Sequence, residues 1–480
     1  MKNIAKQSTK VLILYYIGRL ISFLTKAYFL PWALGAANLG LYSGLYAIGF
    51  VVARLDISNG VIRFFAKLQS DEQKPTFFLI ILIVSTVIYW VVATPLLLWK
   101  APILYFFKDN APEIIDYFPI GMLLGYVILL NITVKSWFVA LKQIIWPNFL
   151  QHITLPLLVD LNVLAYCVGF LSFGQMIKCI LLPYCINLCL LTSYLFYTGE
   201  LRLSLSMKRL EKSFIRSFIL YSLFIILGTN LMFVLTRADT IMILSMCSKE
   251  ETGIYSIIVV VALLLNVPVK AVNQATFSLL ADMLANHYYD DLAHWYKKIT
   301  LYQSFFIGFI FSAIYASLPY IFYALPAQMV YLAKQVFLLL AVGELVYNMF
   351  NTSHAVLTFS KYFKLNIITP LFLCLGIGLN YILISKWGLL GAGFATFVIL
   401  LFAGISNCLL VFYTLKMHPF SLKLFVILLA TCLNIILQSF LPTTSYTFLD
   451  TAFRLLIAIA TYIVLAFCYK DYFVSSPQKN

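Results

Sequence analysis

The sequence has 480 residues, of which 62% are hydrophobic, 16% are aromatic and only 11% are charged. Soluble domains are about 25% charged, so this composition, with a mean hydropathy of +0.95, excludes a soluble globule and predicts a polytopic membrane protein. The apolar runs are continuous and do not alternate, which argues against a β-barrel. The net charge of +15 is explained by loops that face an anionic leaflet, so nucleic-acid binding is not expected.

Apolar runs separated by polar and turn-forming residues predict about fourteen membrane-spanning helices, since each span needs about 20 residues. We predict four parts: an N-terminal six-helix lobe (1–199), a basic cytoplasmic linker (200–213), a C-terminal six-helix lobe (214–414), and two further helices with a cytoplasmic tail (415–480). In chain order the predicted spans are residues 11–33, 40–65, 77–99, 115–140, 149–170, 174–198, 214–237, 252–276, 300–324, 328–352, 366–386, 388–414, 422–441 and 449–470.

Lysine and arginine residues gather on one side of this topology. The N-terminal segment, the linker and the alternate short loops carry most of them. By the positive-inside rule, this imbalance places both termini in the cytoplasm. The opposite loops hold only Lys100, Lys108, Lys249 and Lys386.

A short internal repeat supports two related lobes. Gly40-Leu41-Tyr42-Ser43 recurs as Gly253-Ile254-Tyr255-Ser256, each near the start of the second helix of its half. An even number of helices between the copies gives a parallel repeat, related by an axis along the membrane normal. The last two helices then lie outside the repeat.

The first two predicted helices carry five charges: Arg19, Lys26, Arg54, Asp56 and Arg63. A charge near the bilayer centre costs roughly 3 kcal/mol and is kept mainly where it faces a cavity or a partner. In a continuous second helix, Asp56 lies at the depth of Arg19 and can pair with it. Arg54, roughly 200° around that helix, then points elsewhere, toward a ligand. Arg63 can instead snorkel to headgroups. The surplus of cations predicts an anionic ligand.

The second half adds Arg237 and Asp239 at the predicted outer end of helix seven, and Lys270 within helix eight. Asp239 either neutralises Arg237 or takes part in ion coupling. Two acids, Asp160 and Glu344, stand apart from obvious cations. Each is a candidate for proton or sodium coupling, because burial makes protonation accessible near neutrality. The alternative is a plain hydrogen bond, for which Asn348 lies one turn from Glu344.

These residues form three groups of candidates. The candidate anion ligands are Arg19, Lys26, Arg54, Arg237 and Lys270; secondary substrate contacts are Arg63, Asn59 and Tyr46; and the residues for ion coupling or structural pairing are Asp56, Asp160, Asp239 and Glu344.

Sequence motifs for catalysis are absent. The sequence contains no Walker A, HExxH or GxSxG pattern and no metal-spaced cluster of Cys and His, so we expect neither an enzyme nor a metal site. We expect no cofactor beyond coupling to a proton or sodium gradient.

The whole pattern resembles the oligosaccharide flippases of the multidrug/oligosaccharidyl-lipid/polysaccharide exporter (MOP) superfamily. The resemblance rests on the lysine-rich start, Gly40-Leu41-Tyr42-Ser43, Arg237-Ala238-Asp239, and the run from Gly388 to Thr396 that opens helix twelve. It implies an all-α MATE-like fold, with two parallel six-helix lobes around a central cavity and two C-terminal helices, working by alternating access.

The resemblance also implies a substrate. This would be an undecaprenyl-diphosphate-linked oligosaccharide, turned to the outer leaflet of the bacterial inner membrane for O-antigen, lipopolysaccharide, capsule or exopolysaccharide synthesis. Partners would be membrane lipids, a polysaccharide polymerase and glycosyltransferases. In related lipid flippases, arginines of the first two helices are thought to meet the diphosphate. That role would fall to Arg19, Lys26 and Arg54 here, with Arg63 a less certain match.

Two other functions stay open. A multidrug exporter shares the fold, but such a cavity usually recruits cations through carboxylates. A membrane glycan polymerase, ligase or acyltransferase would process the same lipid carrier, but it needs acid, base or nucleophile groups exposed at one membrane face.

Overall fold

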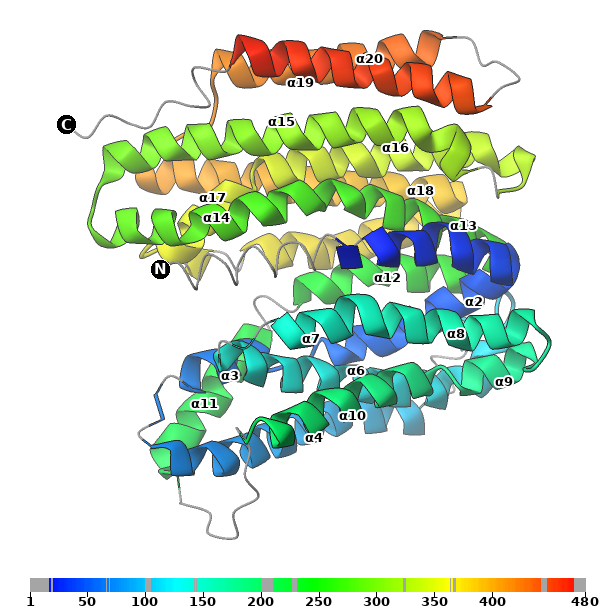
Figure 1. The fold of residues 1–480 in the computed structure, drawn as a ribbon, viewed down its shortest axis with the longest axis vertical. Coiled ribbons are helices and arrows are strands. Elements are labelled where there is room, and N and C mark those ends of the chain that lie inside the picture. Colours follow the sequence, from blue (N-terminus) through cyan, green and yellow to red (C-terminus); the bar gives the residue numbers. More distant parts are fainter. Residues whose placement is uncertain are drawn as a thin grey trace. The chain divides into compact units, whose positions relative to one another are not determined.

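A computed structural model describes residues 17–18, 20–65, 67–68, 70–99, 105–141, 143, 145–199, 210–226, 231–322, 325–362, 364–365, 368–441 and 447–469. The chain divides into two compact units, Met1–Ile257 and Ile258–Asn480. All regular structure in the described ranges is helical, which confirms the all-α prediction (Figure 1). The lobe boundary predicted at 200–213 stays a prediction, because residues 200–209 lie outside the described ranges.

Eleven helical stretches in the described residues are long and apolar enough to cross a membrane. Two of them, Leu20–Phe65 and Cys374–Leu415, are hairpins. Each contains a glycine with positive φ, Gly35 at 68° and Gly388 at 54°, a conformation that side-chain-bearing residues rarely adopt. Both hairpins therefore supply two crossing helices, with turns where the sequence predicts them.

The first unit is built around α6 (Ile114–Ala140), which packs against α2, α3, α4 and α10. Figure 1 shows α4, α6, α8 and α10 lying side by side. The remaining elements of this unit are η1 (Thr25–Phe29), α2 (Leu30–Ala53), α3 (Ser58–Phe65), η2 (Asp71–Gln73), α4 (Lys74–Leu98), α7 (Ile145–Phe149), η3 (Leu150–Thr154), α8 (Leu155–Cys167), α9 (Phe173–Lys178), α10 (Leu181–Tyr197), α11 (Lys212–Ile225), α12 (Leu231–Met246) and most of α13 (Lys249–Ala262).

Two wide π-helical turns, η1 and η3, interrupt helices of this unit just before a proline. Pro31 follows η1 and Pro156 follows η3. A proline inside a helix lacks an N–H and crowds the carbonyl four residues earlier. The backbone hydrogen bonds of the helix are spaced more widely at that place, and this widened turn sets the direction of the side chains on η1.

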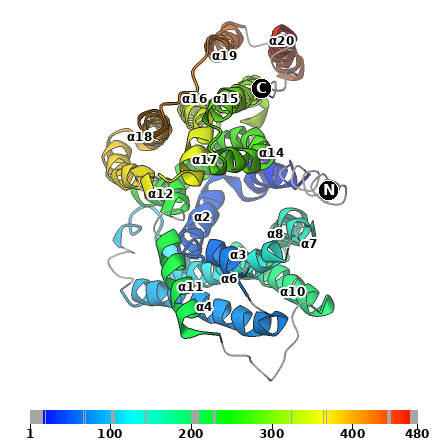
Figure 2. The same cartoon turned by 90° about the vertical axis from the view of Figure 1, so that its left-hand side faces the viewer.

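The second unit is built around α15 (Tyr289–Ile321), which packs against α14, α16, α19 and α20. Figure 2 views these helices nearly end on and shows α19 and α20 as a pair. The other elements are η5 (Leu263–Leu265), α14 (Asn266–Ala285), α16 (Ala327–Met349), α17 (Asn351–Phe359), α18 (Ile368–Leu415), α19 (Leu422–Phe440) and α20 (Thr447–Cys468).

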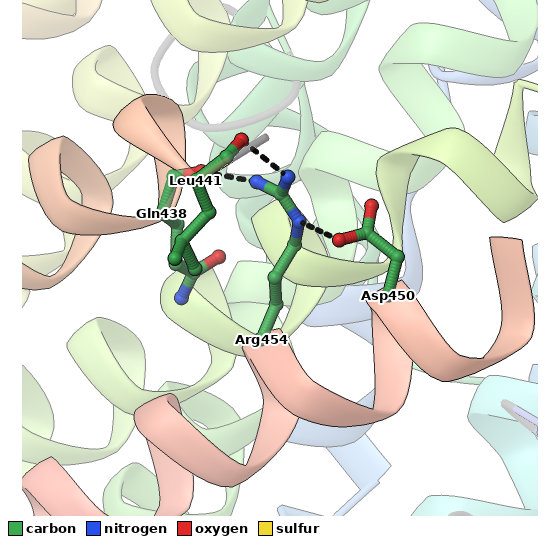
Figure 3. A network of polar contacts seen from close by, with 4 residues as sticks. All are labelled: Gln438, Leu441, Asp450 and Arg454. Carbon is green, nitrogen blue, oxygen red and sulfur yellow. Dashed lines mark hydrogen bonds and ion pairs between the residues drawn. The ribbon is translucent and has the colours of Figure 1, made fainter. Parts of the chain in front are cut away.

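Buried polar contacts join the two C-terminal helices. Arg454 of α20 is only 5% exposed. Its Nε donates to Asp450 at 3.2 Å, and its other nitrogens donate to the carbonyls of Gln438 and Leu441 at the end of α19 (Figure 3). The last carbonyls of a helix have no partner within it, so Arg454 both caps α19 and neutralises Asp450.

An ion pair joins the start of α13 to the segment before α6. Lys249 Nζ lies 2.5 Å from Glu113 Oε1. Partial burial opposes ionisation of Glu113, but the hydrogen bond and charge of Lys249 outweigh it and hold the pKa of Glu113 below its ordinary value of 4.5. The pair therefore stabilises the fold above that pH, and its contribution is lost as the pH falls through the folded-state pKa.

We expect Glu113→Gln to lower stability at pH 7 by less than about 1 kcal/mol, because the carboxylate side chain is 44% exposed and screened. The deficit should vanish at acid pH. Thermal unfolding in detergent between pH 3 and 7 measures it. Glu250→Gln, an exposed neighbour on α13, serves as control. A deficit that stays constant with pH contradicts the prediction.

Candidate anion-binding site

The second membrane helix ends early, and this changes the position of Arg54. Helix α2 stops at Ala53, and α3 begins only at Ser58. Asp56, 1% exposed, accepts hydrogen bonds from the backbone N–H of Ser58 at 3.1 Å and from its hydroxyl. Such a local bond competes with the helical ladder.

The prediction that Arg54 points away from Asp56 is therefore wrong. It assumed a continuous helix, whereas residues 54–57 are not helical. Arg54 Nη1 lies 3.7 Å from Asp56 Oδ2. The predicted pair between Arg19 and Asp56 falls on Arg19, which lies outside the described residues.

Two rings of α2, one helical turn apart, form an aromatic ladder of Tyr46 and Phe50. Their centroids are 5.7 Å apart and their planes are inclined by 29°. Three cations from separate segments meet this ladder. Lys26 Nζ of η1 lies 5.8 Å from the Tyr46 centroid. Arg54 Cζ lies 4.7 Å and Arg237 Cζ of α12 lies 5.7 Å from the Phe50 centroid. The structure thus brings together three of the five predicted anion ligands, which we call the cation cluster.

Arg237 and Asp239 lie inside α12, not at its end as predicted. Asp239, 4% exposed, accepts from Tyr255 Oη at 2.5 Å and from the N–H of Thr240 at 2.7 Å. Residues two apart on a helix face different sides. Asp239 is therefore held by the second copy of the repeat motif, while Arg237 faces Phe50.

The secondary candidates on α3 have other surroundings. Arg63 is exposed, and its Cζ lies 4.4 Å from the ring centroid of Tyr221 on α11. Asn59 is exposed on the same helix. Their predicted contact with substrate stays a prediction.

Asp160 on α8 is held from the first helix. Thr25 Oγ1 donates to Asp160 Oδ2 at 2.8 Å. Thr25 precedes Lys26 in the widened turn η1, so Asp160 is linked through one residue to the cation cluster. Asn162 Nδ2 donates to the carbonyl of Met176 on the neighbouring helix α9 at 3.2 Å.

In the second unit, Glu344 of α16 accepts from Asn348 Nδ2 at 2.9 Å, as the hydrogen-bond alternative predicts. Glu344 does not stand apart from cations, however. Helix α14 packs against α16 and brings Asn266 and Lys270 of α14 close enough to interact with its carboxylate. Lys270 therefore belongs to a polar cluster of the second unit.

Three features of these sites were missed at the level of sequence. Phe50 lies four residues from both Tyr46 and Arg54, a spacing that places all three on one helix face. Lys135, inside the predicted span 115–140, donates to Gln151 of η3. In the second unit, Gln303 donates to Asn273 at 2.8 Å and accepts from Thr352 at 2.9 Å. For Lys135 and Gln303, the signals available in the sequence were an intramembrane lysine and amide side chains within predicted spans.

The fold and these sites define a multi-pass, all-α membrane protein with a cation cluster on one of its spanning helices. No protein family and no curated protein matches the sequence. Solved structures do match it. The structure described as lipid II flippase MurJ in an inward closed conformation is 14% identical, with a TM-score of 0.74, over 96% of this chain and 99% of that chain.

Two MATE structures share the fold as well. An inward-facing multidrug resistance MATE family transporter of the MOP superfamily is 14% identical, with a TM-score of 0.65, over 84% of this chain and 94% of its own. The MATE multidrug transporter DinF-BH is 17% identical, with a TM-score of 0.59, over 86% of this chain and 95% of its own. The expected MATE-like fold is confirmed. The proteins that share it are described as a flippase and as multidrug transporters.

Proposed function

We propose that this protein is a flippase. It carries an undecaprenyl-diphosphate-linked oligosaccharide from the cytoplasmic to the outer leaflet of the bacterial inner membrane by alternating access, for cell-surface polysaccharide synthesis of the O-antigen, capsule or exopolysaccharide type. The observation that carries the proposal is the cation cluster, Lys26, Arg54 and Arg237, gathered on one aromatic ladder. Cations are costly within a membrane unless they have a use. A guanidinium can donate hydrogen bonds to two phosphate oxygens at once.

Within the cluster, Arg54 forms an ion pair with Asp56. Asp239 is engaged by Tyr255 and Thr240. A lipid diphosphate supplies negative charge at the membrane, whereas the cationic substrate of a multidrug exporter would be repelled. A glycan polymerase or ligase would need a reacting group here, and none of the three cations can serve as a nucleophile while charged.

Reconstituted protein tests the proposal. In proteoliposomes, we expect a fluorescent undecaprenyl-diphosphate oligosaccharide to become accessible to a membrane-impermeant quencher at a rate that increases with protein density. A cationic rhodamine dye should show no protein-dependent transport. Dye transport without lipid movement would favour the multidrug exporter, and a change in glycan length would favour the polymerase.

Glu344 is the proposed coupling group for a proton or sodium gradient. Glutamine at this position keeps an oxygen for Asn348 but cannot ionise. We expect Glu344→Gln to bind substrate within about threefold of wild type, since it leaves the cation cluster intact, and to lose acceleration by an imposed gradient. Asp160→Asn tests the other candidate acid in the same assay. Gradient-driven acceleration that persists in Glu344→Gln assigns the coupling elsewhere.

A polysaccharide polymerase and glycosyltransferases are proposed as the machinery around this step. They would supply the lipid-linked glycan on the cytoplasmic side and consume it outside. Both termini are proposed to lie in the cytoplasm.

A further inference from the structure

The ring of Phe50 is shared by two guanidiniums from distant parts of the chain. Arg54 follows Phe50 by one turn, and its backbone N–H bonds to the Phe50 carbonyl at 3.2 Å. Arg237 reaches the same ring from α12. The two cations repel each other, and an aromatic face attracts both. Phe50 therefore helps to offset this repulsion, together with Asp56 beside Arg54.

The two guanidiniums are held in different ways. Arg54 is held by Phe50 and also by Asp56. For Arg237, the structure gives no hydrogen bond or ion pair with any described residue. Its guanidinium lies over the Phe50 ring, and Asp239 is near enough for a weaker electrostatic interaction. Without this ring, Arg237 would keep its charge but lose its fixed position.

A phenyl ring suits this task chemically. It attracts a cation through its π face and has no hydrogen-bonding group. The N–H donors of a guanidinium lie in its own plane as a rigid fork. A cation held by an uncharged ring therefore keeps its N–H donors available for phosphate oxygens. A carboxylate partner at this position would occupy those donors instead.

We propose that Phe50 is a positioning residue that fixes Arg54 and Arg237 as a pair, so that the site selects a diphosphate over a monophosphate. This assignment rests on the proposed function. Each phosphoryl group of a diphosphate accepts hydrogen bonds from one guanidinium, so the positive charges of both arginines are compensated. A monophosphate meets one guanidinium only. On Arg54, which already has Asp56 beside it, a monophosphate leaves Arg237 without an ion-pair partner among the described residues. Tyr46, stacked under Phe50 with Lys26 on its ring, fixes the orientation of the Phe50 ring.

Binding of two matched lipids tests this assignment. The probes are farnesyl diphosphate and farnesyl monophosphate, titrated against full-length protein in detergent. We expect wild type to prefer the diphosphate. Phe50→Leu, which keeps apolar volume but removes the π face, should weaken diphosphate binding roughly tenfold and monophosphate binding much less. The ratio of the two affinities should therefore fall toward one.

Two further variants separate positioning from packing. Phe50→Trp keeps an aromatic face and should restore the preference for diphosphate. Phe149→Leu removes a half-buried ring that stacks on Trp146 and should leave the ratio unchanged. The assignment is overturned if Phe50→Leu keeps the wild-type ratio, or if Phe50→Trp loses it as completely as leucine does. Wild type that binds both lipids equally would also overturn the assignment, whereas wild type that binds neither lipid would overturn the proposed function itself.

Discussion

Replacing Arg54 and Arg237 together by glutamine is expected to weaken binding of farnesyl diphosphate by at least 100-fold. Each guanidinium on the Phe50 ring would lose charge-assisted hydrogen bonds worth about 1.5–3 kcal/mol, and each 1.4 kcal/mol is tenfold in affinity. Flipping of the diphosphate-linked oligosaccharide should fall to the protein-free rate. Titration in detergent and the proteoliposome assay measure the two effects.

Single variants sharpen this expectation. Arg237→Gln should cost more than tenfold, because the donors of Arg237 have no partner among the described residues. Arg54→Gln should cost more than the ligand contact alone, because it also leaves the buried Asp56 without its ion pair. Arg216→Gln, on the exposed face of α11, controls for the loss of one arginine. A double variant that flips the lipid at the wild-type rate, with normal protein level, would remove the cation cluster from the mechanism.

Much of the fold follows from hydropathy and turn residues. The hairpin turn at Gly35 lies in the predicted gap between the first two helices, and the turn at Gly388 falls on the first residue of predicted span twelve. Both predictions succeed because a membrane helix satisfies all of its backbone hydrogen bonds internally. The sequence must then show long apolar runs with turn-forming residues between them.

The break at residues 54–57 was not predicted, because the apolar run continues through it. Its cause is local and polar: Asp56 takes the N–H and hydroxyl of Ser58, a capping arrangement that competes with the helix. An aspartate two residues before a serine inside an apolar run was the available signal. Without this signal, a continuous helix was assumed, and Arg54 was predicted to point away from Asp56, which is wrong.

The sequence predicted which charged residues form the cation cluster better than it predicted what these residues contact. The cost of intramembrane charge predicted that Lys26, Arg54 and Arg237 bind one anion, and that role stays a prediction. It could not identify their meeting place, because only the packing of α12 on α2 brings Arg237 to Phe50. Lys270 carried the same signal, yet its described neighbour is Glu344. Charge in a membrane helix signals a partner, and tertiary packing decides which one.

Replacing Gly40 by alanine is expected to destabilise the protein by about 3 kcal/mol. A Cβ on Gly40 would lie 2.8 Å from the carbonyl carbon of Lys249 and 2.9 Å from the nitrogen of Gly253. A Cβ on Gly253 would lie 2.9 Å from the carbonyl carbon of Ala36 and 3.1 Å from the nitrogen of Gly40. The two glycines that open the repeated motifs therefore pack against each other, and α2 and α13 meet there backbone to backbone.

The sign of this effect is diagnostic. In an ordinary helix position, Gly→Ala stabilises by about 1 kcal/mol. At Gly40 the clash is with main-chain atoms that no rotamer change can move, so overpacking outweighs that gain. For Gly44→Ala, one turn further along α2, the three atoms nearest to the new Cβ all belong to the side chain of Leu244, which can turn away. We expect its stability to stay within about 1 kcal/mol of wild type. Thermal unfolding of both variants in detergent compares them. A Gly40→Ala protein that melts above wild type would show that α2 and α13 do not meet at the repeated glycines.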